Sequence, residues 1–515
     1  MNERLEMVRK YLFSSKNKKR VLKLLNILLK NQILFWYLMF IIISPIIYYV
    51  IFSSLTIPET PRNIQLGLIK FNEQEWIFKQ VVSIYVFSLS VLATLLFWKF
   101  RLTFAMLGFV ILLVSNLVEI ELVVNYMNIP VILFLMGMMV IIHYLEKLGF
   151  FDEILNRALK LTKYEPKSMM VTIILISSLM AALVDEVTSI LFVATLIFSI
   201  CKRFNLDPVP FLLSAIMGTN IGSAATVVGN PVGVYTAIYS GLSFIDFLRW
   251  ATPASIISTF IIALILIRIN KNYLDNIRTQ IGEQPVILDK KTTKVTTIKE
   301  GAVIFIFTFV LLVSHSLIES FLNLSKNTVL VAAPLAITAL ILLKEKERAR
   351  EIFEKSVDWW TLVFFMFLFS MAATFESTGV TAKLSSFLIT LLGIGSEVTI
   401  TNTVITFVVL TFTVGLMSAA VDNIVAVAAM LPITAEIISY NLPNGYILWW
   451  SAVIGGCYFG NLTPIGSTAN IVALSLLEKE RGKLIKFKNW VKIGVLVTLL
   501  STIIAVVYII SLAII

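Results

Sequence analysis

Residues 182–189 read ALVDEVTS and residues 419–426 read AAVDNIVA, so that Asp185 and Asp422 occupy the same place in two similar octapeptides. Each octapeptide interrupts a long apolar stretch of the chain. An ionised carboxylate within a bilayer costs at least about 2.5–3.5 kcal/mol on insertion scales, so a residue of this kind is a candidate for function. The repetition of such a costly feature predicts a duplicated unit with one acidic position buried in each copy.

The composition of the whole chain is that of a membrane protein. Of its 515 residues, 58% are hydrophobic and 14% are charged, whereas soluble domains carry about 25% charged residues. The mean hydropathy is +0.91, and apolar stretches long enough to cross a hydrocarbon core recur throughout the chain. We therefore predict an all-α polytopic membrane protein in contact with the lipid bilayer.

The net charge of +11 does not indicate a nucleic-acid partner, because the Lys and Arg residues lie in short loops between apolar spans, where they orient the chain during insertion. Residues 1–31 carry nine Lys and Arg among Leu and Val. They are predicted to form a basic amphipathic segment on the cytoplasmic face, or to act only as a cytoplasmic retention signal. The two cysteines, Cys201 and Cys457, lie in or beside apolar segments and predict neither a disulfide framework nor a thiolate metal site.

The excess of Lys and Arg in cytoplasmic loops predicts the topology. A first transmembrane helix and its extracytoplasmic loop occupy 32–76, and repeat 1 occupies 77–269. A polar cytoplasmic linker at 270–298 precedes repeat 2 at 299–515. The result is a multi-pass protein with about 11 transmembrane helices, a cytoplasmic N-terminus and an extracytoplasmic C-terminus, placed in the cell membrane if the source is prokaryotic.

Two apolar segments are predicted to be re-entrant hairpins. Residues 168–201 have basic residues at both flanks, so both ends lie in the cytoplasm and the Asp185-Glu186 pair forms the tip. Residues 399–440, with Asp422 and Asn423 at the centre, lie within a stretch that has no Lys or Arg and are predicted to enter from outside. Non-helical backbone at that depth is tolerated only where it lines a cavity or is buried in protein.

Each hairpin is followed by a predicted broken helix, at 208–240 in repeat 1 and at 446–476 in repeat 2, where glycines and prolines interrupt the apolar sequence. The offset between matched positions drifts from 230 for Glu146 and Glu376 to 243 for SFIDF and KFKNW, as expected of one ancestral unit with small loop insertions. The opposed placement of charge makes the two five-helix copies inverted. Inverted repeats with broken helices are the architecture of secondary transporters.

The tips and the broken helices supply the candidate ligands. Unwound backbone offers carbonyl oxygens to Na⁺, and half-helix N-termini offer N–H groups to anions; the alternative role of the small residues is close helix packing. The candidate substrate- or ion-binding residues are Asp185, Glu186, Thr219, Asn220, Thr226, Asn230, Asp422, Asn423, Asn461, Thr463, Ser467, Thr468 and Asn470. A Na⁺ ion is expected near Asp185, Asn220, Asp422 and Asn461.

Glu186 stands where the second repeat has Asn423. Two adjacent carboxylates at low dielectric cannot both ionise at low cost, which makes the pair of Asp185 and Glu186 a candidate proton acceptor or hard-cation ligand. The alternatives are that each aspartate only caps the half-helix that follows it and that Glu186 faces water. His143 and His315 are interpreted as packing residues rather than proton relays.

Six segments of the chain resemble the ion transporter superfamily, in the group of arsenite permeases, melanosomal P-protein and NhaD-type sodium/proton antiporters, which is related to divalent anion:sodium symporters. These segments are residues 137–155, 183–196, 207–231, 357–369, 418–432 and 460–482. The resemblance implies a homodimer with a scaffold part and a moving transport part, an elevator-like movement, and coupling to H⁺ or Na⁺. It carries site positions over to Asp185, Asn220, Asp422, Asn423, Asn461 and Asn470.

The chain departs from this family pattern at two places. The family usually has Asp-Asn at the first tip, where this chain has Asp185-Glu186, and Gly-Asp-Pro-Pro-Asn after the first broken helix, where this chain reads GNPVG at 229–233. We hypothesise that one carboxylate has been relocated from position 230 to position 186, which preserves the number of cations or protons bound. Unchanged transport and an unchanged pH profile in a Glu186→Gln variant would contradict this hypothesis.

The sequence therefore predicts a secondary active transporter of a small inorganic ion or small anion. Sodium/proton exchange and the transport of an oxyanion or carboxylate both agree with the pattern. No phosphate-binding Gly-Lys-Ser/Thr loop is present, so no cofactor is expected beyond the coupling ion. The alternatives from other classes are a passive anion channel and, less favoured, an intramembrane aspartyl protease; an enzyme is not expected.

Overall fold

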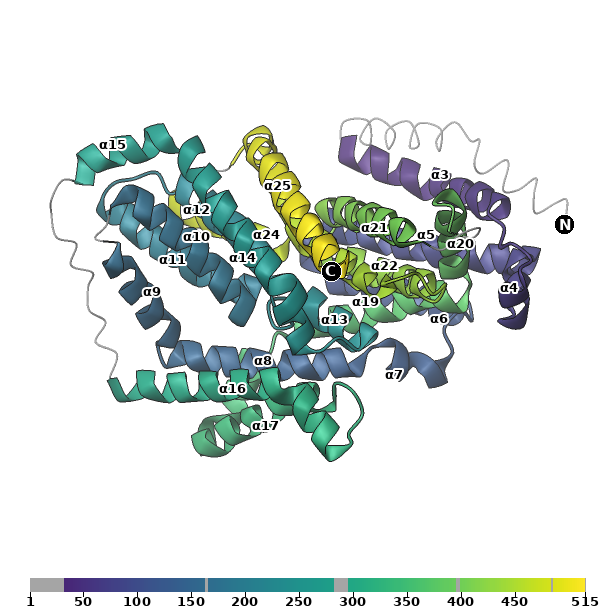
Figure 1. Cartoon of the computed structure of the whole chain (residues 1–515), viewed down its shortest axis with the longest axis horizontal. Coiled ribbons are helices and arrows are strands. Elements are labelled where there is room, and N and C mark those ends of the chain that lie inside the picture. Colours follow the sequence, from purple (N-terminus) through teal and green to yellow (C-terminus); the bar gives the residue numbers. More distant parts are fainter. Residues whose placement is uncertain (1–31, 163–164, 282–294, 395–398, 483–484, 515) are drawn as a thin grey trace, which may run out of the picture.

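The computed structural model describes residues 32–162, 165–281, 295–394, 399–482 and 485–514, and these residues form helices and loops without a strand. The segment 1–31, predicted to be basic and amphipathic, lies outside the described residues. Helices predominate because lipid offers no partners to backbone N–H and C=O groups, which must be satisfied within each segment. Figure 1 shows most of the long helices running roughly along the longest axis of the molecule.

The first part of the chain and the first repeat comprise fifteen of these elements. They are α3 (Gln32–Ser54), α4 (Pro61–Gln65), η1 (Leu68–Asn72), α5 (Gln74–Leu96), η2 (Trp98–Phe100), α6 (Arg101–Val114), η3 (Ile120–Leu122), α7 (Val123–Tyr126), α8 (Ile129–Lys147), α9 (Phe150–Leu161), α10 (Pro166–Leu183), α11 (Glu186–Arg203), α12 (Val209–Gly222), α13 (Pro231–Ser240) and α14 (Phe244–Ile269).

The linker helix and the second repeat follow in the same order. They are α15 (Lys271–Ile281), α16 (Val295–Leu322), α17 (Thr328–Glu345), η4 (Lys346–Arg348), α18 (Ala349–Ser356), α19 (Trp359–Ser377), α20 (Val380–Leu391), α21 (Ile400–Ala420), α22 (Asn423–Ile438), η5 (Gly445–Leu448), α23 (Trp449–Tyr458), η6 (Phe459–Asn461), α24 (Thr468–Arg481) and α25 (Phe487–Ile514).

Both predicted hairpins are present. α10 and α11 reverse at Val184 and Asp185, and α21 and α22 reverse at Val421 and Asp422. Figure 1 shows the first hairpin toward the end of the molecule that holds α15, and the second toward the end that holds α4 and α20. The hairpins therefore approach the centre from opposite ends, as an inverted repeat requires.

Close packing between each hairpin and its broken helix repeats in the two copies. α10 lies against α12, and α21 lies against α23. A Cβ atom on Gly218 would come to 2.7 Å from the carbonyl oxygen of Ile174, and one on Gly455 would come to 2.5 Å from that of Thr411. Gly218 and Gly455 are 237 positions apart, as are Ile174 and Thr411, so the same glycine contact serves both repeats.

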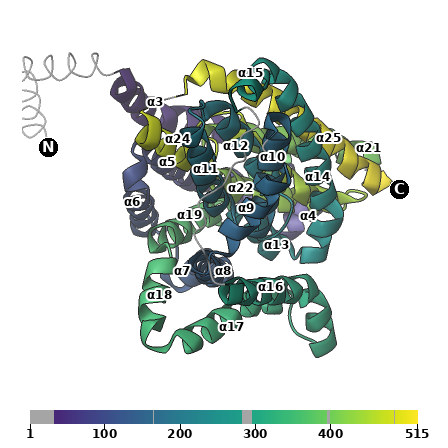
Figure 2. The same ribbon diagram turned by 90° about the vertical axis from the view of Figure 1, so that its left-hand side faces the viewer.

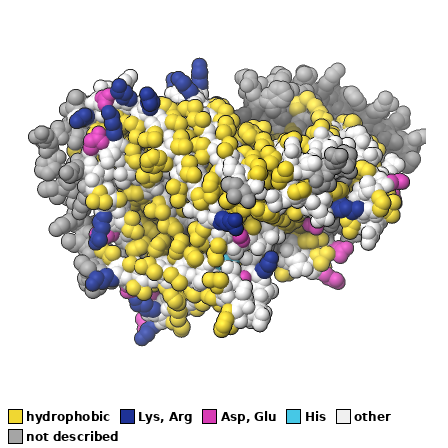
Figure 3. All heavy atoms as spheres, viewed as in Figure 1, with side chains coloured by type: hydrophobic (Ala, Val, Ile, Leu, Met, Phe, Trp, Pro, Cys, Tyr) yellow, Lys and Arg dark blue, Asp and Glu magenta, His cyan; other side chains and the backbone are white. Residues whose placement is uncertain are grey.

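The helices agree with the predicted multi-pass membrane fold. In the described part of the chain, nine helices are long and apolar enough to cross a membrane, among them α10 and α21 of the hairpins. Shorter apolar helices lie at Met39–Ser54, Val209–Gly222, Val380–Leu391 and Asn423–Ile438. Figure 3 shows hydrophobic side chains over the middle of one face, with many of the visible Lys and Arg toward the end that holds α15.

Part of the predicted polar linker 270–298 is helical. In α15, Leu274 and Ile277 are buried, and Lys167 at the start of α10 forms an ion pair of 3.5 Å with Asp275. The buried side chains of α15 and this ion pair therefore hold the start of the linker against the first hairpin.

Figure 2 shows α16, α17 and α18 as a group that projects from the remaining helices.

Candidate functional site

A cavity of about 390 Å³ lies where the two hairpin tips meet. Its wall includes Asp185 and Glu186 from the first tip and Asp422 from the second. Asn230 at the start of α13 and Thr468 at the start of α24 belong to the same wall, as does Asn423. The structure thus brings six of the predicted site residues, from both repeats, to one space.

Four half-helices begin next to this cavity, and each is capped by a predicted site residue. Asp185 accepts hydrogen bonds from the backbone N–H groups of Val187 (2.8 Å) and Thr188 (2.9 Å), and Asp422 accepts one from Ile424 (3.2 Å). The capping role considered for the two aspartates is therefore present. These carboxylates also cancel the positive end of the helix dipoles that would otherwise attract an anion.

The caps of the two broken helices match each other in the same way. Asn230 accepts a hydrogen bond of 2.9 Å from the N–H of Gly233, and Ser467 accepts one of 3.1 Å from that of Ala469. Asn230 also donates from its amide nitrogen to the Ser223 hydroxyl at 2.9 Å. Asn230 and Ser467 are 237 positions apart, the offset that also relates Asp185 to Asp422.

Three carboxylates line the cavity close to one another. Glu186 is 5% exposed and lies close enough to Asp422 and Asp185 to interact with both electrostatically. Its Oε1 atom accepts a long hydrogen bond of 3.4 Å from the Ser467 hydroxyl, while its buried Oε2 atom has no hydrogen-bond partner. Asp422 accepts a hydrogen bond of 2.6 Å from Thr468. Among the described residues, no Lys, Arg or His forms an ion pair with these three carboxylates.

A cluster of buried amides lies at the breaks of the two broken helices. Asn220 donates from its side-chain nitrogen to the side-chain oxygens of Asn461 (2.8 Å) and Asn470 (2.9 Å). Asn470 in turn donates to the carbonyl oxygens of Gly460 (2.7 Å) and Thr463 (3.0 Å). The hydrogen bonds join Asn220 to Asn461 and Asn470, and the expected Na⁺ ion near Asp185, Asn220, Asp422 and Asn461 stays a prediction.

Two oxygen atoms beside this cluster lack partners. The side-chain oxygen of Asn220 and the hydroxyl of Thr219 are buried without a hydrogen bond. A buried polar atom left without a partner costs about 1–3 kcal/mol. Such atoms are the kind of ligand that a hard cation such as Na⁺ takes. No group of three or more His, Cys, Asp and Glu side chains in the described part of the chain is arranged to hold a metal ion.

Thr226 and Thr463 lie outside the cavity wall. Thr226 donates from its hydroxyl to the carbonyl oxygen of Ala182, and Thr463 donates to that of Ala419 at 2.6 Å. Each threonine therefore connects a broken helix to the last turn before a hairpin tip.

Asn423 holds the second tip against its broken helix. With its side-chain nitrogen facing the neighbouring acceptors, it donates to the Ser418 hydroxyl (2.9 Å) and to the carbonyl oxygens of Gly456 and Gly466.

The mouth of the cavity holds charged residues that the sequence did not single out. Arg101 donates to the hydroxyl of Thr361, which donates to Asp358, and all three residues line the cavity. His143, interpreted as a packing residue, is instead 40% exposed in the cavity wall, with its Nδ1 3.6 Å from Glu146. The interpretation fits His315, which is buried with its Nδ1 2.8 Å from the carbonyl oxygen of Leu312.

The inverted repeat, the paired hairpins and the central cavity define a membrane transport protein. A model of the citrate transporter family matches residues 91–455, and the chain belongs to that family. It is 32% identical to a 46 kDa membrane protein of Mycobacterium leprae over 73% of this chain and 85% of that protein.

More distant relatives agree with this assignment. The P protein of Sus scrofa is 24% identical over 75% of this chain and 53% of that protein. The crystal structure of the Alcanivorax borkumensis YdaH transporter shares the fold, with a TM-score of 0.51 and 13% identity over 76% of this chain and 87% of that chain. The resemblance to the ion transporter superfamily is therefore confirmed.

Proposed function

We propose that the protein is a secondary active transporter in which Asp185, Glu186 and Asp422 bind the coupling cation, H⁺ or Na⁺. The observation that carries the proposal is the buried and unpartnered Oε2 atom of Glu186, which lies with two further carboxylates in one cavity wall. Several ionised carboxylates in a low-dielectric site are stable only when protons or cations offset their charge. Binding and release of a cation at this place would therefore change the charge of the cavity in each transport cycle.

A second element of the proposal is a Na⁺ position at the amide cluster. The free oxygens of Thr219 and Asn220 lie on α12 beside the break of the first broken helix. Carbonyl, amide and hydroxyl oxygens are suitable Na⁺ ligands, and unwound backbone in transporters supplies them. The proposal thus has a carboxylate position that accepts H⁺ or Na⁺ and a neutral position that accepts Na⁺.

An anion is the second candidate for the transported substrate. Arg101 lines the cavity mouth and forms no ion pair within the described residues, so its guanidinium is available to a carboxylate group. The family description, citrate transporter, agrees with such a substrate. The anion would enter past Arg101 together with the coupling cation, whereas a passive anion channel would carry current without a coupled cation.

The proposed movement separates the helices into two bodies. We assign the hairpins, their broken helices, α14 and α25 to a moving body, and α5, α6, α8, α16, α17 and α19 to a scaffold; this assignment is supported by packing of helices within each group. The cavity mouth lies near Lys99 and Lys147, at an end where basic loops favour the cytoplasm. We infer a cytoplasmic N-terminus, an extracytoplasmic C-terminus, an elevator-like exchange of the cavity between the two sides, and assembly as a homodimer.

The proposal is tested in proteoliposomes that contain a trapped pH dye. An imposed proton gradient that collapses on addition of Na⁺ with the wild type, and not with Asp185→Asn or Glu186→Gln, would support cation/proton exchange. Glu75→Gln is the matched control, because Glu75 is an exposed carboxylate at the start of α5. Gradient collapse that is equally fast in both cavity variants contradicts the proposal.

A second set of liposomes separates coupled anion transport from a channel. Citrate or arsenite is added with and without Na⁺, and uptake is compared with the current across a planar bilayer. Uptake that requires the cation supports coupled transport. A current that is linear in voltage and independent of Na⁺ and H⁺ would instead assign the protein to the passive anion channels.

A further inference from the structure

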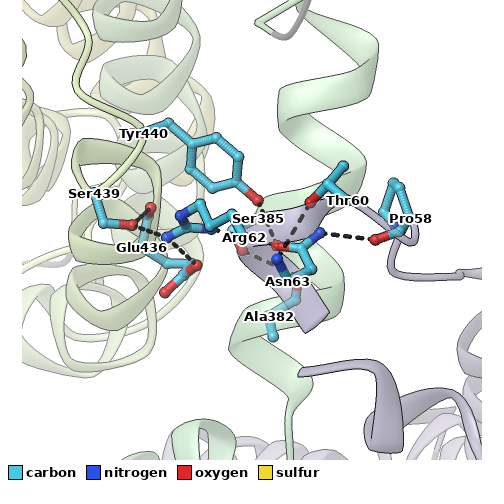
Figure 4. A network of polar contacts seen from close by, with 9 residues as sticks. All are labelled: Pro58, Thr60, Arg62, Asn63, Ala382, Ser385, Glu436, Ser439 and Tyr440. Atoms are coloured by element: carbon cyan, nitrogen blue, oxygen red, sulfur yellow. Dashed lines mark hydrogen bonds and ion pairs between the residues drawn. The ribbon is translucent and has the colours of Figure 1, made fainter. Parts of the chain in front are cut away.

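An arginine on a short extra helix reaches across to the second hairpin. Arg62 of α4 lies 374 positions away from Glu436 of α22. Its Nη2 atom forms an ion pair of 3.0 Å with the Glu436 carboxylate and also donates to the Ser439 hydroxyl. The guanidinium lies 3.9 Å from the centre of the Tyr440 ring (Figure 4). Three side chains at the C-terminal end of α22 thus contact the Arg62 guanidinium.

The neighbouring Asn63 fixes α4 in the position that this contact needs. Asn63 is buried, donates from its side-chain nitrogen to the carbonyl oxygen of Pro58 at 2.9 Å, and donates from its backbone to Thr60 at 3.2 Å. Its side-chain oxygen accepts a hydrogen bond of 3.4 Å from Tyr440 (Figure 4). Arg62 therefore lies in a turn that is held by its own hydrogen bonds.

The segments that precede and follow α4 are held by α20 and α5. Gln80 of α5 donates to the carbonyl oxygens of Phe71 (2.9 Å) and Thr378 (3.2 Å). Lys383 of α20 is 1% exposed and donates from its Nζ atom to the carbonyl oxygen of Phe52 at 2.6 Å, at the last turn of α3. The Arg62 contact therefore links the second hairpin to a segment that is held by α5 of the scaffold and by α20.

The link lies at the end of the molecule opposite to the cavity mouth. Asp358, which lines the cavity, caps the start of α19, and Glu376 lies at the other end of that helix. A helix of 19 residues is about 28 Å long. Glu376 lies close enough to Glu436 to interact with it electrostatically. Arg62 therefore offsets negative charge at one end of α19, while Asp358 lines the cavity at the other end.

We propose that Arg62 and Glu436 form a latch that holds the second hairpin against the scaffold while the cavity is open at the Asp358 end. The proposal rests on the alternating exchange of the cavity put forward under Proposed function. Movement of α22 away from α4 would break this contact, because the segments on either side of α4 are held by α5 and α20. The two side chains are 28% and 25% exposed, so water can replace the contact when it opens.

The latch is tested by the access of a reporter cysteine to a membrane-impermeant maleimide. Val472→Cys is the reporter, because Val472 lines the cavity and the native Cys201 and Cys457 are buried. Labelling rates are measured from each side in inside-out and right-side-out vesicles, and their ratio reports which end is open. Arg62→Ala and Glu436→Gln are each expected to shift the ratio away from the Asp358 end by roughly three- to tenfold, as one half-buried charge pair with a cation–π contact allows.

Three further measurements decide between a latch and a purely structural contact. The double variant is expected to shift the ratio no more than either single variant, and high salt is expected to shift the wild type but not Arg62→Ala. Lys79→Ala, which breaks the ion pair of Lys79 with Glu75 within α5, is expected to leave the ratio unchanged. An unchanged ratio in monodisperse Arg62→Ala and Glu436→Gln proteins, or additive shifts in the double variant, overturns the latch. Because labelling needs no substrate, this result is independent of whether the cavity carboxylates couple transport.

Discussion

Ser467 donates a hydrogen bond of 3.4 Å to the carboxylate of Glu186, which connects the second broken helix with the tip of the first hairpin. The repeat mates of these residues, at the offset of 237, are Asn230 and Asn423. Both mates line the same cavity but carry no charge. The two repeats are therefore alike in backbone and unlike in charge, and the asymmetry is concentrated at Glu186.

Replacement of Glu186 by glutamine is expected to slow coupled transport by roughly tenfold or more. The change keeps the size of the side chain and removes one charge from a site where a charged hydrogen-bonding group contributes about 1.5–3 kcal/mol. Proton-driven uptake into proteoliposomes measures the rate at several pH values. A variant that retains the wild-type rate and pH profile would show that the Glu186 carboxylate lies outside the coupling path.

A carboxylate at position 230 is expected to restore part of the transport that Glu186→Gln removes. Asn230 caps α13 through its side-chain oxygen, and aspartate caps a helix equally well, so Asn230→Asp keeps this cap while it loses the amide donor to Ser223. The double variant Glu186→Gln/Asn230→Asp then has the original number of carboxylates in the cavity. The same proteoliposome assay compares it with both single variants. A double variant no faster than Glu186→Gln alone argues against the hypothesis that the charge was relocated.

Much of the fold could be predicted because charge and apolar length carry strong information in a membrane protein. Asp185 and Asp422 stand out against apolar neighbours, and the basic flanks of one hairpin and the neutral flanks of the other indicate their opposite directions. The four helix caps at the cavity follow from the same residues, since Asp, Asn and Ser at a helix start accept backbone N–H groups. Asp185, Asp422 and Ser467 accordingly stand at the starts of three helices.

Other parts of the site could not be predicted from local patterns. Arg101 and Asp358 lie at the ends of apolar spans, where single charges are usually interpreted only as topology signals. The contacts of Asn220 with Asn461 and Asn470 depend on side-chain directions at the helix breaks. The contact of Arg62 with Glu436 joins residues that no pattern relates, because α4 has no counterpart in the repeat.

Alanine at either Gly218 or Gly455 is expected to destabilise the protein by about 1–3 kcal/mol, the cost of an extra methyl group in a tightly packed site. The added Cβ atom would meet a backbone carbonyl oxygen in both cases, and a carbonyl within a helix cannot move aside easily. Thermal unfolding in detergent, followed by tryptophan fluorescence, measures the effect.

The matched control for these variants is Gly445→Ala, whose Cβ would lie 3.3 Å from the Leu442 Cβ, and it is expected to cost less. Equal stability of all three variants would show that the helix contacts adjust without cost. A loss at one glycine and not at its mate would show that the two copies of the contact differ in their tolerance.

Sodium ions are expected to raise the melting temperature of the wild-type protein and to raise that of Asn220→Ala much less. Thr219 and Asn220 are adjacent in the sequence. The hydroxyl of Thr219 and the side-chain oxygen of Asn220 are both buried and have no hydrogen-bond partner. A ligand that binds only the folded state at a concentration one hundred times its dissociation constant stabilises it by about 2.7 kcal/mol. The melting temperature is measured in NaCl and in choline chloride at equal ionic strength, so that screening is the same.

Thr226→Val is the control, because Thr226 donates its hydrogen to the carbonyl oxygen of Ala182 and makes no hydrogen bond with the amide cluster. Equal Na⁺ stabilisation of wild type and Asn220→Ala would remove the amide cluster as a Na⁺ position and leave the carboxylates at the hairpin tips as the place where the cation binds.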